Sequence, residues 1–207
     1  MRVIGGSAKG RPLKGPRPAK SGPAHIRPTS DKVRGALFDL IVGHVEGARV
    51  LDLYAGTGAL AIEALSRGAA SADLVESDRD ARRIIAANLE QLGFADRARV
   101  WPLTVERALA QLSGQYDVIL ADPPYADSIA SSLLSNLCAH GLLGPATLVA
   151  VEHASRFPLP DEVSELHLYK RRRYGDTTLS IYERQNTAHQ ALCEKSRDTD
   201  ASQESAS

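Results

Sequence analysis

The nine residues Val50-Leu51-Asp52-Leu53-Tyr54-Ala55-Gly56-Thr57-Gly58 decide the fold of this chain. An apolar run of strand length leads into a glycine turn, and Gly56 to Ala61 match the G-x-G-x-x-G/A fingerprint that joins a strand to a helix. Gly56 can adopt a positive φ, and we expect Gly58 to let the backbone approach a ligand with no Cβ in the way. The next helix offers unpaired N–H groups to an anionic group. The stretch therefore predicts a doubly wound α/β fold that binds a nucleoside cofactor.

Short apolar segments alternate with amphipathic ones from Arg49 onward, which predicts a parallel sheet with helices on both faces. The expected strands are Val50–Tyr54, Ala72–Glu76, Arg99–Leu103, Val118–Ala121 and Thr147–Val151, and the expected helices are Ala59–Ser66, Asp80–Leu92, Val105–Leu112 and Ser128–His140. Glu165–Tyr174 and Thr177–Arg184 then alternate like an antiparallel hairpin. The sequence predicts a Rossmann-like fold of the class I methyltransferase type, with a seven-stranded, mostly parallel sheet that ends in this hairpin.

Composition divides the chain into three expected regions. Residues 1–28 form a basic N-terminal appendage, with short β-strands at Val3-Ile4 and Pro12-Leu13, and residues 29–184 form the catalytic domain. Residues 185–207 are polar and rich in Ser, Thr, Gln and Ala, so they cannot bury enough apolar surface to offset their ordering entropy. We expect this tail to be disordered and to have no function.

The formal net charge of the chain is zero, but nine basic residues precede Gly35 against the single acid Asp31, a local net charge of +8. Two interpretations remain open: a solvated basic leader, or an arm that contacts RNA phosphates and releases their counterions. The candidate RNA contacts in this arm are Arg2, Lys9, Arg11 and Lys14.

A second basic cluster, Arg171-Arg172-Arg173, falls on a strand with alternating side chains. Arg171 and Arg173 are therefore expected on one face of the sheet and Arg172 on the other. The charges either protect a solvated edge strand from aggregation or contact RNA, with Arg171 and Arg173 as the candidate contacts.

Several classes of protein are excluded. No apolar stretch approaches the ~20 residues that cross a bilayer, and the beginning of the chain lacks the apolar run of a secretory signal. Cys138 and Cys193 form no disulfide framework, and the six histidines show no metal-ligand spacing. We expect a cytoplasmic protein without a metal.

The cofactor is indicated by acids near the glycine turn. Glu76 lies 20 residues after Gly56, where it can accept hydrogen bonds from both ribose hydroxyls, but NAD and S-adenosylmethionine fit this spacing equally. Asp52 favours S-adenosylmethionine, because an acid here can accept from the methionine ammonium and would repel a diphosphate; a turn-capping carboxylate is the alternative. Thr104-Val105 falls where adenine would lie, and no acid occupies this point, so backbone groups or the Thr104 hydroxyl are expected to bind it.

Asp122-Pro123-Pro124-Tyr125 ends the fourth expected strand and fits the chemistry of an amine acceptor. The lone pair of an exocyclic amine on a nucleobase is delocalised into the ring. An Asp122 carboxylate oxygen and the Pro123 carbonyl can each accept one N–H, which favours a pyramidal nitrogen whose lone pair points at a sulfonium methyl. The two prolines stiffen the turn, and Tyr125 can stack on the base. These four residues are the expected catalytic group of an amino-group methyltransferase.

From Arg2 to about Glu183 the sequence resembles a family, the bacterial 16S ribosomal RNA guanine-N2 methyltransferases of the RsmD type. The resemblance is carried by Arg2-Val3-Ile4-Gly5-Gly6 with Lys9-Gly10-Arg11-Pro12-Leu13, Arg27-Pro28-Thr29-Ser30-Asp31-Lys32-Val33-Arg34 leading to Leu37-Phe38, the stretch from Leu51 to Gly58, Asp122-Pro123-Pro124-Tyr125 and Tyr174-Gly175-Asp176-Thr177. It implies S-adenosylmethionine as donor, a monomer, and guanine 966 (in the RNA's own numbering) of an assembled small subunit as substrate. It also implies that the loop with Arg27 and Thr29 closes over the methionine end of the cofactor, although Thr29 equally fits a helix cap.

The expected cofactor contacts are therefore Arg27, Thr29, Asp52, Tyr54, Gly56, Thr57, Gly58, Glu76, Ser77, Thr104, Val105 and Asp122. Three alternatives remain. Adenine-N6 methylation of DNA or RNA suits the same pair of acceptors. A non-catalytic RNA-binding module would not need the Asp122 turn. An NAD-linked dehydrogenase matches only the glycine fingerprint.

Overall fold

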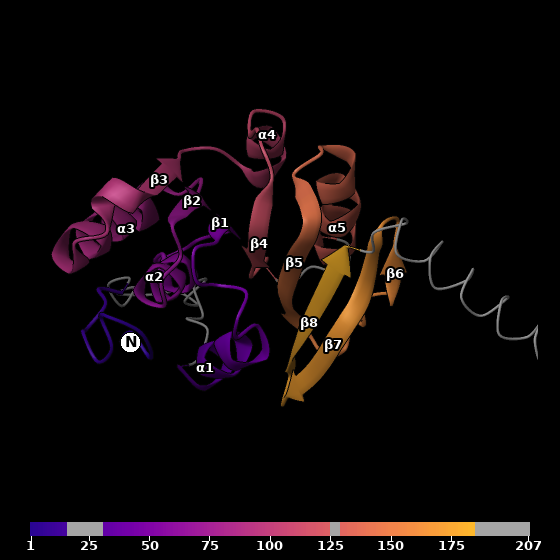
Figure 1. Cartoon of the computed structure of the whole chain (residues 1–207), viewed down its shortest axis with the longest axis horizontal. Helices are drawn as coiled ribbons and strands as arrows, with labels where there is room; N and C mark the ends of the chain where they lie inside the picture. Colours follow the sequence, from indigo (N-terminus) through magenta and orange to yellow (C-terminus); the bar gives the residue numbers. More distant parts are fainter. Residues whose placement is uncertain (16–30, 125–128, 185–207) are drawn as a thin grey trace, which may run out of the picture.

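A computed structural model describes residues 1–15, 31–124 and 129–184, which form one eight-stranded sheet with helices on both faces (Figure 1). The elements in chain order are α1 (Asp31–Leu40), β1 (Arg49–Leu53), α2 (Ala59–Ser66), β2 (Ser71–Val75), α3 (Arg79–Leu92), the 3-10 turn η1 (Ala95–Arg97), β3 (Ala98–Trp101), α4 (Val105–Leu109), β4 (Tyr116–Ala121), α5 (Ile129–Ala139), β5 (Leu143–Ala154), β6 (Glu162–Val163), β7 (Leu166–Tyr174) and β8 (Thr177–Arg184).

The strand order is β3-β2-β1-β4-β5-β8-β7-β6. Strands β1 to β5 pair in parallel, whereas β8 is antiparallel to both β5 and β7, so the expected final hairpin is confirmed. The expected count of seven strands was short by one, because β6 adds a two-residue pairing to the edge at β7. A pairing this short carries no alternation that a sequence pattern could reveal.

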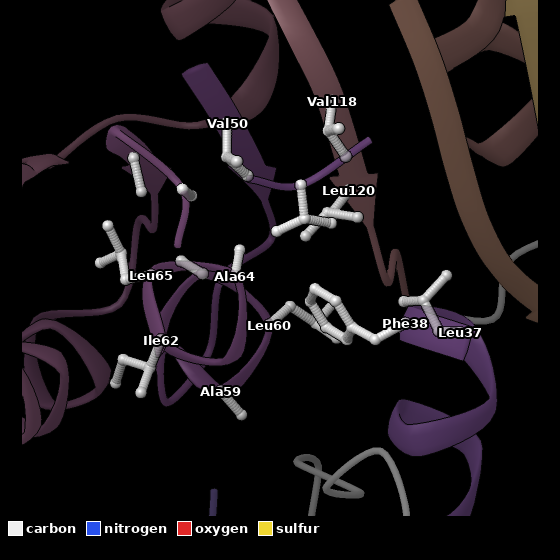
Figure 2. Packing of buried hydrophobic residues seen from close by; sticks show 14 of the residues in the cluster. Leu37, Phe38, Val50, Ala59, Leu60, Ile62, Ala64, Leu65, Val118 and Leu120 are labelled. Atoms are coloured by element: carbon white, nitrogen blue, oxygen red, sulfur yellow. The ribbon is translucent and has the colours of Figure 1, made fainter. Parts of the chain in front are cut away.

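Alternate residues of the strands enter two cores on opposite faces of the sheet. One face of the sheet is covered by α1, α2 and α3 and is called here the α1–α3 face. In the core on this face, Val118 and Leu120 of β4 belong to the same cluster as Phe38 of α1 and Leu60 of α2 (Figure 2). On the other face, Ile119 packs with side chains of α4 and α5. Strands β1, β2, β4 and β5 are buried on both faces over most of their length, which explains their largely apolar sequences, whereas β3 at the edge of the sheet is only partly buried.

Helices α2 and α3 begin in different ways. Asp78 caps α3, where its side chain accepts a hydrogen bond from Ala81 N at 2.7 Å, and Gly93 ends the helix with a φ of 75°. Helix α2 follows Gly58 with no side-chain cap, and all of its residues are buried. The N–H groups of its first turn lie beside the glycine turn, and the Asp52 carboxylate rather than the N-cap residue accepts from one of them, Ala61 N.

Residues 1–15 dock on α2. The buried Glu63 carboxylate accepts hydrogen bonds from Ile4 N at 2.8 Å and Gly5 N at 2.7 Å, and the Ser66 hydroxyl accepts from Ala8 N at 2.9 Å. The two expected β-strands of the appendage are reduced to one isolated bridge between Arg2 and Pro12. The polar groups of this segment bind to α2, so strand pairing satisfies only a few of them.

Among the described residues, no helix is long and apolar enough to span a bilayer. Within the same ranges, no group of three or more His, Cys, Asp or Glu side chains could hold a metal ion. Arg27 and Thr29, Tyr125 and the tail 185–207 lie outside the described residues.

Candidate active site

A cleft of about 680 Å³ opens at the carboxyl ends of β1, β2, β3 and β4. The order of connections reverses between β1 and β4, and ligands of open α/β sheets bind at such a switch point. The cleft is lined by Met1, Asp52, Tyr54, Ala55, Gly56, Thr57, Ala59, Leu60, Val75, Glu76, Ser77, Asp78, Ala81, Leu103, Thr104, Val105, Glu106, Asp122, Pro123 and Pro124. Its volume suits a nucleoside-sized ligand.

The glycine turn combines three positive φ angles: 62° at Tyr54, 56° at Gly56 and 78° at Gly58. A Cβ on Gly58 would lie 3.3 Å from Leu74 Cδ2 and 3.4 Å from Ile62 Cδ1. Gly58 therefore lets α2 pack against the sheet, and the expectation that it clears the way for a ligand is wrong. A Cβ on Gly56 would meet only the Tyr54 carbonyl oxygen, at 3.9 Å, so Gly56 is the glycine whose backbone is open to approach.

Glu76 is fixed by the turn that it faces. One carboxylate oxygen accepts from Gly56 N at 2.8 Å, and the other accepts from Asp78 N at 2.7 Å. Each carboxylate oxygen has a second lone pair, so the group keeps the capacity to accept from ribose hydroxyls. Ser77, which is exposed, follows it along the wall of the cleft.

Asp52 is buried, and its Oδ2 accepts from Ala61 N of α2 at 3.0 Å. Burial raises the pKa of Asp52 to about 8; the Ala61 N–H opposes this shift, and the charges of Asp122 and Glu76 add to it. The capping role considered as an alternative is therefore present. Three acids nevertheless converge on one cleft, which favours a ligand that carries positive charge.

Asp122, Pro123 and Pro124 line the same cleft, directly after the pairing of Ala121 with Leu53 and Val151. The structure therefore brings together the two parts of the site that the sequence separates by about 65 residues, the glycine turn and the end of β4. An acceptor held by the Asp122 turn would lie next to a ligand held by the glycine turn.

The third wall holds Thr104, Val105 and one acid that the sequence analysis missed. Glu106, in the first turn of α4, lines the cleft one residue beyond Thr104-Val105, so this wall does hold an acid; binding of adenine by backbone groups or the Thr104 hydroxyl stays a prediction. Burial, and second the charge of Glu106, raise the pKa of Tyr54 to about 12. The available signal was an acid in the first turn of the helix that follows β3.

Met1 is the other lining residue that the analysis missed. Its sulfur lies 4.0 Å from the Thr57 hydroxyl of the glycine turn. The N-terminal segment reaches the cleft because it docks on α2, and such a contact between distant segments has no local sequence signal.

The candidate RNA contacts of the appendage are all exposed, but they are not equally available. The Arg11 guanidinium donates to the Gln91 carbonyl. The backbone of Lys14, rather than its side chain, is hydrogen-bonded to α3: its N–H donates to Asn88 Oδ1 at 2.8 Å, and its carbonyl accepts from the Asn88 side-chain amide at 3.1 Å. Arg2 and Lys9 complete the set on the docked segment.

Arg171 and Arg173 share a face, as expected, but it is the face opposite Asp122. Arg171 pairs with Ser180, and its guanidinium donates to Ser180 Oγ at 3.1 Å, Asp161 Oδ1 at 2.9 Å and the Leu159 carbonyl at 2.6 Å. These contacts bind Arg171 to the protein itself. Arg172 pairs with Leu179 and so belongs to the α1–α3 face.

A parallel sheet with this strand order and an antiparallel final hairpin is the scaffold of the class I methyltransferases, and the cleft lies where that class binds S-adenosylmethionine. The residues fit this cofactor. Glu76 can hold the ribose, and Gly56 leaves space for the link between the ribose C5′ and the sulfonium sulfur. The three acids, Asp52, Glu76 and Asp122, suit an ammonium and a sulfonium.

The chain belongs to the family described as "Conserved hypothetical protein 95", whose model matches residues 1–183, and it is an RsmD-type methyltransferase. Ribosomal RNA small subunit methyltransferase D of Escherichia coli is 34% identical over 185 residues, which are 89% of this chain and 90% of that protein. YlbH of Bacillus subtilis is 37% identical over 187 residues, 89% of this chain and 99% of that protein. The solved structure of Escherichia coli YhhF matches with a TM-score of 0.78 at 33% identity, over 89% of this chain and 98% of that one.

Proposed function

We propose that this chain transfers a methyl group from S-adenosylmethionine to the N2 amine of a guanine in 16S rRNA, at a guanine 966-type position of the small ribosomal subunit. The observation that carries the proposal is the meeting of Asp122 and Pro123 with Gly56 and Glu76 in one cleft. The Escherichia coli relative is named as a small-subunit rRNA methyltransferase, which supports this class of substrate. We expect a cytoplasmic monomer that acts on the assembled particle.

The protein contributes position and charge to the reaction. When bound, S-adenosylmethionine supplies an electrophilic methyl group on a sulfonium. Asp122 would accept a hydrogen bond from one amine N–H and the Pro123 carbonyl from the other, so that the nitrogen lone pair points along the line from methyl to sulfur. Well-oriented reactants can lower a barrier by roughly 7–11 kcal/mol, so alignment is the main contribution of the turn. The acids around the cleft would hold the cationic cofactor, and Asp122 would stabilise the positive charge that develops on the amine as the N–C bond forms and the C–S bond breaks. S-adenosylhomocysteine then leaves, and the methylated amine gives up one proton.

The second candidate is methylation of an adenine N6 amine, because the Asp122 turn can grip that amine in the same way. The two activities leave different products, N2-methylguanosine and N6-methyladenosine. The decisive assay incubates the purified chain with labelled S-adenosylmethionine and small subunits from bacteria that lack their own RsmD-type enzyme, followed by mass spectrometry of the digested rRNA.

N2-methylguanosine at one position supports the proposal, and N6-methyladenosine replaces it with the second candidate. Free 16S rRNA is the matched substrate control. Equal activity on free rRNA and on the particle would contradict the assignment of the assembled subunit as substrate.

A further inference from the structure

The sites across the sheet follow one another in the strand order. Glu76 follows β2, the glycine turn follows β1 and Asp122 follows β4, so a cofactor in this cleft would span these three strand ends. Methyl transfer requires the acceptor nitrogen on the side of the methyl group opposite to sulfur. The base must therefore lie beyond Asp122, over the next strand in the sheet, which is β5 (Figure 1).

Glu152 is the acid of β5 at this level of the sheet; it lies next to Asp122, just outside the residues that line the cleft. Strands β4 and β5 are parallel, and the last registered pair, Ala121 with Val151, makes Asp122 and Glu152 the next neighbours. Both belong to the α1–α3 face, since Leu120 and Ala150, two residues earlier, enter the core on that face. Neighbouring strands lie about 4.8 Å apart, so two carboxylates can reach adjacent atoms on one edge of a base.

The chemistry of that edge separates the purines. Guanine carries N1–H next to its N2 amine, and a carboxylate accepts from N1–H. Adenine carries a lone pair at N1 next to its N6 amine, and a carboxylate repels it. Glu152 is only 6% exposed, and in such a shielded place both the attraction and the repulsion are stronger than in water.

From this placement, we propose that Glu152 selects guanine over adenine by accepting a hydrogen bond from guanine N1–H, while Asp122 and the Pro123 carbonyl hold the N2 amine. The proposal rests on the proposed function and adds the residue that determines its base specificity. Glu152 takes no part in methyl transfer itself, because it contacts the base without exchanging a proton.

The test compares two bases that share the reacting amine. Guanine and 2-aminopurine both carry an exocyclic 2-amine, but N1 of 2-aminopurine bears a lone pair instead of a hydrogen. Small subunits are reconstituted from ligated 16S rRNA with either base at the position that the unaltered enzyme methylates. The measurement is kcat/KM for methyl transfer to each base, by the unaltered enzyme and by Glu152→Gln.

Glutamine can either accept from N1–H or donate to an N1 lone pair, so it discriminates less. A hydrogen bond between an ionised group and N1–H should give the unaltered enzyme a preference for guanine to which Glu152 contributes roughly 10- to 100-fold. We expect the guanine to 2-aminopurine ratio to fall by at least about 10-fold in Glu152→Gln. Loss of the O6 atom in 2-aminopurine affects both enzymes and cancels in this comparison.

Two further variants complete the design. Glu183→Gln alters an acid on the same face at the other end of the β5–β8 pair, where Glu183 is opposite Leu148, and it should keep the original ratio. Glu152→Asp keeps the carboxylate and should keep a preference for guanine over 2-aminopurine. If Glu152→Gln folds poorly, this variant tests the role of the Glu152 carboxylate instead, and loss of the preference would contradict that role.

An unchanged ratio in Glu152→Gln, or an equal fall in Glu183→Gln, would overturn the role of Glu152 while leaving guanine-N2 methylation intact. Methylation of adenine N6 by the unaltered enzyme would instead overturn the proposed function, and this inference with it. The two failures are thereby distinguishable.

Discussion

Asp52 shows how the cleft alters the chemistry of a single carboxyl group. Its ordinary pKa of 3.8 is raised to about 8, chiefly by burial and further by Asp122 and Glu76. At pH 7 the group is therefore mostly protonated in the free enzyme. A ligand with positive charge would favour the ionised form and lower this pKa again.

Binding of S-adenosylmethionine at pH 7 should therefore release a proton from Asp52. Calorimetric titration in buffers of different ionisation enthalpy measures the number released, and we expect up to about one proton per site. The release should diminish above the raised pKa, because Asp52 is then ionised before binding. Asp52→Asn is the control and should remove the effect; an equal release from this variant would assign the proton to another group.

Burial of Asp52 also makes it a source of pH-dependent stability. The folded state binds its proton more tightly than the unfolded state, so between the unfolded pKa and about pH 8 the folded protein carries more protons. The free energy of unfolding should therefore fall as pH rises through this window. Asp52→Asn should show a flatter dependence in urea titrations at pH 6 and pH 9, and identical slopes for the two proteins would contradict the raised pKa.

Asp122→Asn tests the acceptor turn separately from the cofactor cleft. Asparagine keeps the size of the side chain and loses the charge that stabilises the reacting amine, so kcat should fall by at least about 100-fold. The Kd for S-adenosylmethionine should change only a few-fold, because Glu76 and the glycine turn remain. Single-turnover kinetics and calorimetry measure the two quantities, and normal turnover would remove Asp122 from the mechanism.

At the scale of elements, most of the parallel sheet was predictable because each buried strand is a continuous apolar run. Helix α2 begins and ends at the expected residues, and β8 does so as well. The short β6 was not predictable because a two-residue pairing shows no alternation, and the docking of residues 1–15 on Glu63 was not predictable because it joins segments distant in the sequence. Glu106 differs from both, because a local signal exists for it: it lies in the first turn of α4, one residue beyond Thr104-Val105, and lines the cleft.

The glycine turn is the element whose role the structure changes most. Gly58→Ala should lower the free energy of unfolding by ~2–5 kcal/mol, because alanine would add both a left-handed strain at a φ of 78° and a Cβ 3.3 Å from Leu74. Gly93→Ala is the matched control: its φ is 75°, and a Cβ there meets nothing within 4 Å, so strain alone should cost ~1–2 kcal/mol. Chemical denaturation measures both, and equal losses would show that Gly58 is required only for its backbone angle.

For the whole molecule, the order of strands sets the order of ligands. Glu76, the glycine turn, Asp122 and Glu152 end β2, β1, β4 and β5 or lie close to those ends, so cofactor, methyl group and base would lie in a row across one edge of the sheet. The row continues to β8 and β7, where Leu179 pairs with both Glu152 and Arg172. A chain of RNA that delivers a base to Glu152 would therefore pass toward Arg172.

The two faces of β7 should then differ in their contribution to RNA binding. Lys170 and Arg172 share the α1–α3 face with Asp122, whereas Arg173 points to the other face. Replacing Lys170 and Arg172 with Gln should weaken binding to the small subunit and make the dependence of log K on log salt shallower by roughly 0.7 for each phosphate contact that is lost. Arg173→Gln should leave that slope unchanged. Binding titrations from low to high salt compare the variants at equal folding stability. An equal loss of slope in Arg173→Gln would instead favour Arg171 and Arg173 as the RNA contacts. The phosphates would then run along the opposite face of the β7–β8 hairpin. The RNA would reach the cleft around the edge of the sheet rather than across β8.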